Sequence, residues 1–471
     1  MYSLLFLVVS SFLFSLLLTP LARNLARHWG WVDHPDHGRK LHTIPIPRVG
    51  GIAILASYLL AFASLLLSGL QAAQVVHGGL PLAFRLFPAA SLIFGLGVLD
   101  DMITLSAAPK FAVQIAAAGL VYFAGVQVHG FGAYQIGGWL SLPATIFWLV
   151  LCTNAVNLID GVDGLAAGVG LFATATTLLA ALLQNNLDLA IAVAPLLGCL
   201  LGFLRYNFNP ATVFLGDSGS LFIGFVLGAC SILWSQKSAT MLGMTAPLLA
   251  LSIPLLDTVL AIARRFLRRQ PLFTADRGHI HHRLLDRGFS PRAVALVIYG
   301  ICSLTAILSL LVMNRRFEGV VIVLFCAATW IGVQHLGYVE FGVAGRMFVE
   351  GAFRRLINAN IALQALEQRL QSAHTPDECW SVIQDSAHEF GFHAVEMSLA
   401  GRLYRCRNGG SFERSWHVRI PLSQSEFVQL TREYDTPSQH SLIAPYADSV
   451  RRILDPKLVS FDRAQAATLS R

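Results

Sequence analysis

Four short polar clusters interrupt an otherwise apolar sequence, and their residue types could carry out phosphate chemistry. The first cluster is the adjacent pair Asp100 and Asp101, which follows the apolar run GLGVL. Neighbouring carboxylates at the edge of a membrane are costly, so they indicate a function. They could bind a metal ion, or one could accept a proton from a phosphate. A solvated helix end is the alternative.

The second cluster, NAVNLIDGVDG, begins at Asn154. Asn154, Asn157 and Asp160 recur at every third position, so they share one face if a helix continues through them. Asp163 follows three residues later. Side-chain oxygens of this kind suit Mg²⁺ or the polar edges of a nucleoside. A polar turn between two helices is the alternative.

The third cluster, GDSGS at residues 216–220, precedes another apolar run. Small residues that open a helix present backbone N–H groups and the positive end of the helix dipole to an anion. This cluster could therefore bind a diphosphate, and Asp217 could hold a metal ion that bridges it. The same pattern is also typical of an ordinary helix start.

The fourth cluster contains His279, His281 and His282 in a basic segment. Three histidines could bind zinc, but no cysteine accompanies them. Hydrogen bonds from the rings to phosphates are therefore the favoured interpretation. An exposed polar loop is the alternative.

Two further charged residues lie in or beside apolar segments. Lys110 could neutralise a phosphate, or it could anchor a helix at the membrane interface. Asp257 lies inside an apolar segment, where an acid indicates a function by default. A structural pair with Arg264, seven residues later on the same helical face, is the alternative for Asp257.

The composition indicates that lipid surrounds much of the chain that positions these clusters. Hydrophobic residues make up 55% of the 471 residues and charged residues only 13%, whereas a soluble domain has about 25% charged residues. Apolar runs long enough for a span of ~20 residues begin near Tyr2, Gly50, Leu82, Phe111, Leu140, Leu165, Leu187, Ser220, Leu242, Ala293 and Gly319. The sequence therefore predicts an all-α polytopic membrane protein with about eleven transmembrane helices. The runs near Leu165 and Leu187 could also form one interrupted segment.

Lysine and arginine predict which helix ends face the cytoplasm. The loop after the first helix contains Arg39, Lys40 and Arg48, and the loop after the ninth is rich in arginine. The odd-numbered loops are therefore predicted to be cytoplasmic, with the N-terminus outside. All four clusters fall in odd-numbered loops, which predicts one cytoplasmic active site. The net charge of +7 favours contact with an anionic membrane and not with nucleic acid.

The chain changes character near Phe341, after which charged residues are frequent. We therefore predict a transmembrane domain at residues 1–340 and a small soluble, cytoplasmic α+β domain at residues 345–471. Thr375 and Glu378 predict a capped helix start, and alternating apolar residues indicate strands that follow it. This region faintly resembles GAF-type ligand-sensing domains. Our hypothesis is that it has a regulatory or docking role.

The motifs together resemble the polyprenyl-phosphate N-acetylhexosamine-1-phosphate transferases, a superfamily that includes WecA-type and TagO-type enzymes and, more distantly, MraY. The motifs, in family order, are GRKLHTIPIPRVGG, GVLDD, PKFAVQ, NAVNLIDGVDGLAAG, NPATVFLGDSGS, PLLDTVLAIARR and DRGHIHHRLL. The resemblance runs from about Pro35 to Phe289, and by topology to about Tyr338. It implies a helical bundle with a cytoplasmic site, in which a lipid phosphate attacks the β-phosphorus of a UDP-sugar and UMP leaves.

The resemblance also implies roles for individual residues. Asn157 and Asp217 would bind Mg²⁺, with Mn²⁺ as the alternative cofactor. Asp100 or Asp101 would act as a base or hold the lipid phosphate, and Lys110 would contact a phosphate. The substrate-binding candidates are Asn154, Asp160 and Asp163, the latter two near the uridine, and Arg265, His279, His281 and His282, near the diphosphate and sugar.

Related enzymes often carry a third acid three residues beyond the acidic pair. Here that position is Thr104, so the role of the third acid is absent or replaced.

The predicted function is transfer of N-acetylglucosamine-1-phosphate from a UDP-sugar to undecaprenyl phosphate in a bacterial inner membrane, which starts an envelope glycan such as O-antigen. An MraY-type pentapeptide substrate is disfavoured, because MraY-type enzymes tend to have three consecutive histidines. N-acetylfucosamine stays open as the sugar. A transporter is disfavoured because the acids lie at helix ends, and a catalytically inactive anchor because Asn157 and Asp217 are intact. Two partners stay open predictions: a second copy in a homodimer and, through the C-terminal domain, a later glycosyltransferase.

Overall fold

The computed structural model describes residues 2–35, 44–68, 71–131, 134–135, 137–236, 245–268, 270–271, 278–314, 316–338, 352–407, 415–423, 425–433 and 443–469. Arg39, Lys40 and Phe341, which entered the sequence analysis, lie outside these residues. The chain divides into two compact units, Met1–Tyr338 and Val339–Arg471.

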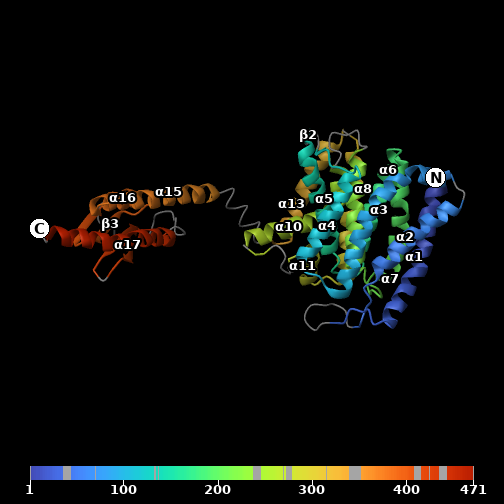
Figure 1. The fold of residues 1–471 in the computed structure, drawn as a ribbon, viewed down its shortest axis with the longest axis horizontal. Coiled ribbons are helices and arrows are strands. Elements are labelled where there is room, and N and C mark those ends of the chain that lie inside the picture. The colour runs from blue at the N-terminus through green and yellow to red at the C-terminus, as the bar shows by residue number, and fades with distance from the viewer. Residues whose placement is uncertain are drawn as a thin grey trace. The chain divides into compact units, whose positions relative to one another are not determined.

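The first unit is helical, and its long helices lie side by side as a bundle (Figure 1). In chain order the helices are α1 (Tyr2–His28), α2 (Gly50–Leu67), α3 (Gln71–Ile103), α4 (Ala107–Phe123), α5 (Gly138–Leu158), α6 (Leu165–Leu183), α7 (Leu187–Asn207), α8 (Gly216–Gln236), α9 (Thr245–Ala250), α10 (Ser252–Leu267), α11 (Ile280–Asp286), α12 (Pro291–Val312) and α13 (Glu318–His335). A short antiparallel ribbon, β1 (Gly130–Phe131) and β2 (Tyr134–Gln135), connects α4 and α5.

Within the described residues, 9 helices are long and apolar enough to cross a membrane, which confirms a polytopic membrane protein. The segments near Leu165 and Leu187 are two separate helices, and the Asn186 side chain caps the second by accepting from Leu189 N–H. The run predicted to begin near Leu242 starts outside the described residues, and from Thr245 onward the structure divides it into α9 and α10. Pro254 lies in the first turn of α10, where proline is tolerated, whereas it would disrupt a continuous helix.

Helix α8 is the central helix of the bundle. It packs against α2, α3, α5 and α6. In its most apolar stretch 83% of the residues are buried, compared with 6% for α13. The surrounding helices therefore hold α8 from several sides, which fixes the position of any side chain at its N-terminal end.

The second unit is an α+β unit, as the composition predicted. It consists of α15 (Ala352–Ser372), α16 (Pro376–Glu389), β3 (Ala394–Leu399), β4 (Arg402–Arg407), β5 (Ser415–Pro421), β6 (Phe427–Glu433) and α17 (Ile443–Leu469). The strands form an antiparallel sheet in the order β4-β3-β6-β5. Its core joins Met397 of the sheet to Leu370, Ile383 and Leu454 of the three helices. The Thr375 hydroxyl caps α16 by accepting from Glu378 N–H, as predicted.

Candidate active site

Two chain segments that lead into helices pair with each other beside the candidate site. Phe214 N–H donates to Pro47 O at 2.8 Å, and Gly51 N–H donates to Leu215 O at 3.0 Å. A Cβ built on Gly51 would lie 2.3 Å from Gly219 N, and one on Gly97 of α3 would lie 2.4 Å from Ser218 Cα. Only glycine therefore lets α2 and α3 approach the start of α8 this closely.

Asp101 caps the start of α8. Its Oδ1 accepts from Asp217 N–H at 2.8 Å, and its Oδ2 accepts from Ser218 N–H at 2.9 Å. These are two of the N–H groups that the sequence analysis offered to a diphosphate. In the structure a carboxylate of the same chain takes them, which satisfies the helix terminus internally.

Asp100, the neighbour of Asp101, faces a different partner. Its Oδ1 accepts from Leu105 N–H at 2.6 Å, and its Oδ2 pairs with Lys110 Nζ. The Lys110 ammonium also lies 3.3 Å from Asp217 Oδ2. Thr104 ends α3 in a left-handed conformation with φ +49°, which brings the chain back toward the Asp100 carboxylate. One cation therefore lies between two carboxylates that come from α3 and α8.

Asn157 completes this group from the last turn of α5. Its Nδ2 donates to Asp217 Oδ1 at 2.9 Å and to Ser220 Oγ at 2.9 Å. Both amide hydrogens are thereby used, so Oδ1 is left as the atom that could ligate a cation. Asn154, one turn earlier, donates from Nδ2 to Gln114 Oε1 of α4 at 2.6 Å. Its amide braces two helices of the site.

The turn after α5 carries the two remaining acids of the second cluster. The helix ends at Leu158, so Asp160 lies in the turn and not on the helical face of Asn157. Burial raises the pKa of Asp160 well above its usual range, the charges of Asp217 and Asp101 raise it further, and Arg48 lowers it. Asp163 Oδ2 accepts from Asn209 Nδ2 at 3.0 Å and from the backbone N–H of residue 211 at 2.9 Å. Asp163 thus holds the loop that precedes α8.

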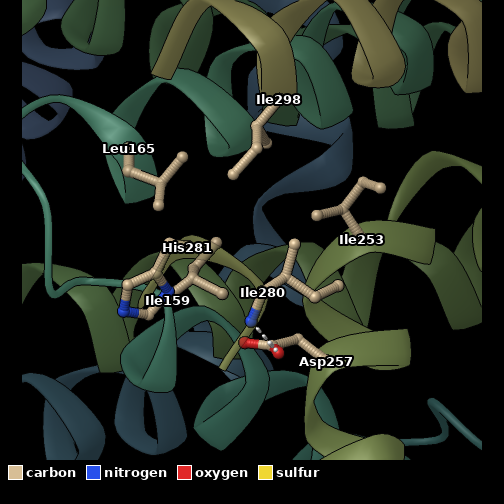
Figure 2. A pocket seen from close by; sticks show the side chains of 7 residues that line it. All are labelled: Ile159, Leu165, Ile253, Asp257, Ile280, His281 and Ile298. Atoms are coloured by element: carbon tan, nitrogen blue, oxygen red, sulfur yellow. Dashed lines mark hydrogen bonds between the residues drawn. The ribbon is translucent and has the colours of Figure 1, made fainter. Parts of the chain in front are cut away.

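The histidine cluster lies on the other side of this turn. His279 Nδ1 is 2.9 Å from Asp257 Oδ2. Ile280 N–H donates to Asp257 Oδ1 at 2.8 Å (Figure 2). The rings of His279 and His281 stack with their centroids 5.7 Å apart, and that of His282 is 4.3 Å from His281. A Cβ on Gly161 would lie 2.9 Å from His281 Nε2, so this ring rests against the turn.

His281 borders a small pocket that is otherwise mainly apolar (Figure 2). The lining residues are Ile159, Leu165, Ile253, Asp257, Ile280, His281 and Ile298. Burial, with smaller effects from the neighbouring histidines, lowers the pKa of His281 to about 4. His281 is therefore neutral near pH 7 and cannot neutralise a phosphate.

Arg265 and Arg264 are both buried near the end of α10, about two turns beyond Asp257. The Arg264 guanidinium lies 5.5 Å from the centroid of the Tyr338 ring. Asp257 accepts a hydrogen bond from Ile280 N–H and pairs with His279, which joins this acid to the histidine cluster.

Three residues of the site were not singled out from the sequence. Gln114 was quoted within the motif PKFAVQ, and it stands one helical turn after Lys110, a signal that could have identified it. Arg48 was used only to assign membrane sides, yet its charge acts on Asp160. Ser220 bonds Asn157 through its hydroxyl. All three lie inside motifs that were already recognised.

The oxygen donors of this site suit Mg²⁺. Asp100 and Asp217 supply carboxylates, and Asn157 supplies an amide oxygen. In the described part of the chain no group of three or more His, Cys, Asp or Glu residues could hold a metal ion by itself. Mg²⁺ is commonly bound by one or two carboxylates together with substrate phosphates and water, which this donor set fits. It does not fit a zinc site built only from the protein.

Comparison with known proteins places this arrangement in a family. Residues 83–235 match the model of glycosyl transferase family 4. The chain is 37% identical over 297 residues to the "Probable undecaprenyl-phosphate N-acetylglucosaminyl 1-phosphate transferase" of Bacillus subtilis (strain 168), covering 62% of this chain and 80% of that protein.

Two further relatives agree. The decaprenyl-phosphate N-acetylglucosaminephosphotransferase of Mycobacterium tuberculosis (strain ATCC 25618 / H37Rv) is 35% identical, over 59% of this chain and 74% of its own. The undecaprenyl-phosphate alpha-N-acetylglucosaminyl 1-phosphate transferase of Escherichia coli (strain K12) is 30% identical, over 69% and 88%. The chain belongs to glycosyl transferase family 4, among the WecA-type and TagO-type enzymes, which confirms the resemblance.

Proposed function

We propose that this protein transfers N-acetylglucosamine-1-phosphate from UDP-N-acetylglucosamine to undecaprenyl phosphate and releases UMP. The names of its relatives in Bacillus subtilis and Escherichia coli support this transfer. The structural observation that carries the proposal is the convergence of Asp100, Lys110, Asn157 and Asp217 at the start of α8. Two carboxylates, an amide oxygen and an ammonium at one point are suited to a diphosphate and a cation.

In the proposed reaction an oxygen of the lipid phosphate attacks the β-phosphorus of the donor. The bond from this phosphorus to the bridging oxygen breaks, and UMP leaves with the electron pair. A lipid phosphate is already ionised near neutral pH, so positioning and charge stabilisation supply most of the rate. Bound Mg²⁺ would neutralise the charge that develops on the diphosphate. Asp217, Asn157 and Asp100 are the residues that would hold it.

Lys110 has two states in this proposal. In the structure its ammonium neutralises Asp100 and Asp217. When a divalent cation takes over that role, the ammonium is released to contact a phosphate oxygen of either substrate. Asp100 limits how far it can move, because α3 and α4 hold the pair from adjacent chain segments.

We also propose that the site faces the cytoplasm of a bacterial inner membrane, where UDP-sugars are made. The arginine-rich segments beside the site support this orientation. Labelling of cysteines introduced at exposed Asp188, in the first turn of α7, and at exposed Arg287 tests it. A membrane-impermeant reagent added to intact spheroplasts should reach the first position and not the second.

UMP release tests the proposed reaction. Membranes containing the full chain receive undecaprenyl phosphate, Mg²⁺ and, in turn, UDP-N-acetylglucosamine, UDP-N-acetylfucosamine or the UDP-muramyl-pentapeptide. We expect UMP with the first donor, a loss of about 100-fold or more in Asp217→Asn, and an unchanged rate in Asp188→Asn, an acid at a distant helix start. UMP with the pentapeptide donor alone would favour the MraY-type reaction, and no UMP from folded protein would contradict transferase activity.

A further inference from the structure

Two residues hold His279: Asp257 contacts its ring, and Tyr338 contacts the backbone directly before it. Asp257 is 2% exposed and His279 is 5% exposed, so their hydrogen bond is shielded from water. One oxygen of the Asp257 carboxylate is hydrogen-bonded to His279 Nδ1, and the other accepts from Ile280 N–H. An ionised carboxylate only accepts hydrogen bonds, so Nδ1 must carry its hydrogen. Nε2 is then the ring nitrogen that is left for a substrate.

The second residue is Tyr338, the last residue of the first unit. Its hydroxyl donates to Gly278 O at 3.1 Å, directly before His279. The Tyr338 side chain is itself held, because the Arg283 guanidinium lies 3.9 Å from its ring centroid. Burial raises the pKa of Tyr338 to about 12, so the hydroxyl keeps the hydrogen that it donates.

The end of α13 is fastened to the same segment by its backbone. Arg283 Nη1 donates to Leu336 O and to Gly337 O, each at 3.0 Å, and Arg287 Nη2 donates to His335 O. Arg283 belongs to α11, which begins at Ile280 directly after His279. The histidine segment and the end of the last span therefore form one hydrogen-bonded structure.

We propose that Asp257 and Tyr338 are positioning residues for His279, an inference that rests on the proposed transferase function. Asp257 fixes the orientation and tautomer of the ring, and Tyr338 fixes the backbone that carries it. With Nδ1–H bonded to Asp257, the ring presents Nε2 to the donor substrate.

Kinetics of the full chain in lipid nanodiscs test this inference. In Asp257→Asn the amide must donate to His279 Nδ1 while its oxygen keeps Ile280 N–H, which forces the opposite tautomer. We expect kcat to fall about 10- to 100-fold, with KM for UDP-N-acetylglucosamine changed less than about threefold. Tyr338→Phe should lower kcat about three- to tenfold. The matched control is Tyr206→Phe, which removes a similar hydroxyl bond to Leu16 O between α7 and α1 and should have no effect.

A double variant separates positioning from general damage. If Asp257 acts through His279, Asp257→Asn combined with His279→Ala is no slower than His279→Ala alone. Additive losses, or a wild-type kcat in both Asp257→Asn and Tyr338→Phe, overturn the inference.

The ring nitrogens supply a readout that needs no activity. In ¹⁵N-histidine spectra of the full chain, the signals missing from His279→Ala belong to His279. We expect them to show Nδ1–H in the wild type and in Tyr338→Phe, and Nε2–H in Asp257→Asn. An unchanged tautomer in Asp257→Asn overturns the role of Asp257. A wild-type protein that releases no UMP contradicts the proposed function instead, whatever tautomer it shows.

Discussion

The side chain of Asp101 binds the backbone of Asp217: its carboxylate accepts the Asp217 N–H at 2.8 Å. The two members of the acidic pair thereby have different tasks. Asp100 faces Lys110 and the proposed metal position, while Asp101 holds the helix that presents Asp217. Of the two adjacent acids, Asp100 therefore supplies charge to the site, and Asp101 stabilises the helix that carries Asp217.

Replacement of Asp101 should damage the site without removing any proposed ligand. In Asp101→Ala the start of α8 loses its cap, which costs about 0.5–2 kcal/mol of stability, and Asp217 shifts. We expect a lower thermal unfolding midpoint and a kcat reduced by about 100-fold. Asp101→Asn, which keeps one acceptor oxygen, should retain more of both. Equal unfolding midpoints for Asp101→Ala and the wild type would contradict the capping role.

Two glycines of α3 form a matched pair for testing the approach of α3 to α8. A Cβ on Gly97 would lie 2.4 Å from Ser218 Cα, whereas one on Gly95 meets nothing within 4 Å. Gly97→Ala should therefore push α8 away, costing about 1–3 kcal/mol or more and abolishing UMP release. Gly95→Ala should be neutral or slightly stabilising. The check is the unfolding midpoint and UMP release of both variants, and similar behaviour of the two would count against the close packing.

The Gln114–Asn154 pair should be energetically coupled. Gln114 is 2% exposed, and Gln114→Ala removes its hydrogen bond with the Asn154 amide, which keeps its bond to Val150 O, so we expect a cost of about 0.5–1.5 kcal/mol. We also expect a lower kcat, because Lys110 lies one turn away on α4 and Asn157 one turn away on α5. A double-mutant cycle with Asn154→Ala measures the coupling, expected near 1 kcal/mol. Strict additivity would show that the pair does not brace the two helices.

His281 should make the protein sensitive to acid. Its pKa is about 4 in the folded protein and 6.5 ordinarily, so the unfolded chain binds more protons between these values. Stability is then complete above pH 6.5 and falls as the pH drops toward 4, by up to about 3 kcal/mol. In His281→Asn the thermal unfolding midpoint should depend less on pH over this range. The exposed His417, changed to Asn as the control, should leave the slope as it is.

Much of the fold could be predicted from the sequence because each span satisfies its backbone hydrogen bonds locally. The apolar runs therefore located the helices to within a few residues. The exceptions were α3, which begins at Gln71 and not near Leu82, and the segment near Leu242, which the structure divides into two helices with Pro254 in the first turn of the second. Average hydropathy does not register a single proline.

The site was predictable in its membership but not in its contacts. The polar clusters were recognised one by one, and loop parity suggested that they meet. Which atoms meet depends on side-chain geometry that spacing does not reveal: Asp101 turned toward Ser218 N–H, Asp163 toward the loop before α8, and Asp257 toward His279. The glycines that permit this geometry, Gly51 and Gly97, carry no chemical signal at all.

The fastening of α13 has a practical consequence for protein engineering. Arg283 and Arg287 bind the carbonyl oxygens of residues 335–337, and Tyr338 bonds Gly278 O. A shortened enzyme, or one fused to a reporter, should therefore keep every residue through 338 and be joined beyond it. A cut made only a few residues earlier, at the end of α13, would remove carbonyl oxygens that accept hydrogen bonds from Arg283 and Arg287. It would thereby loosen the segment that carries His279.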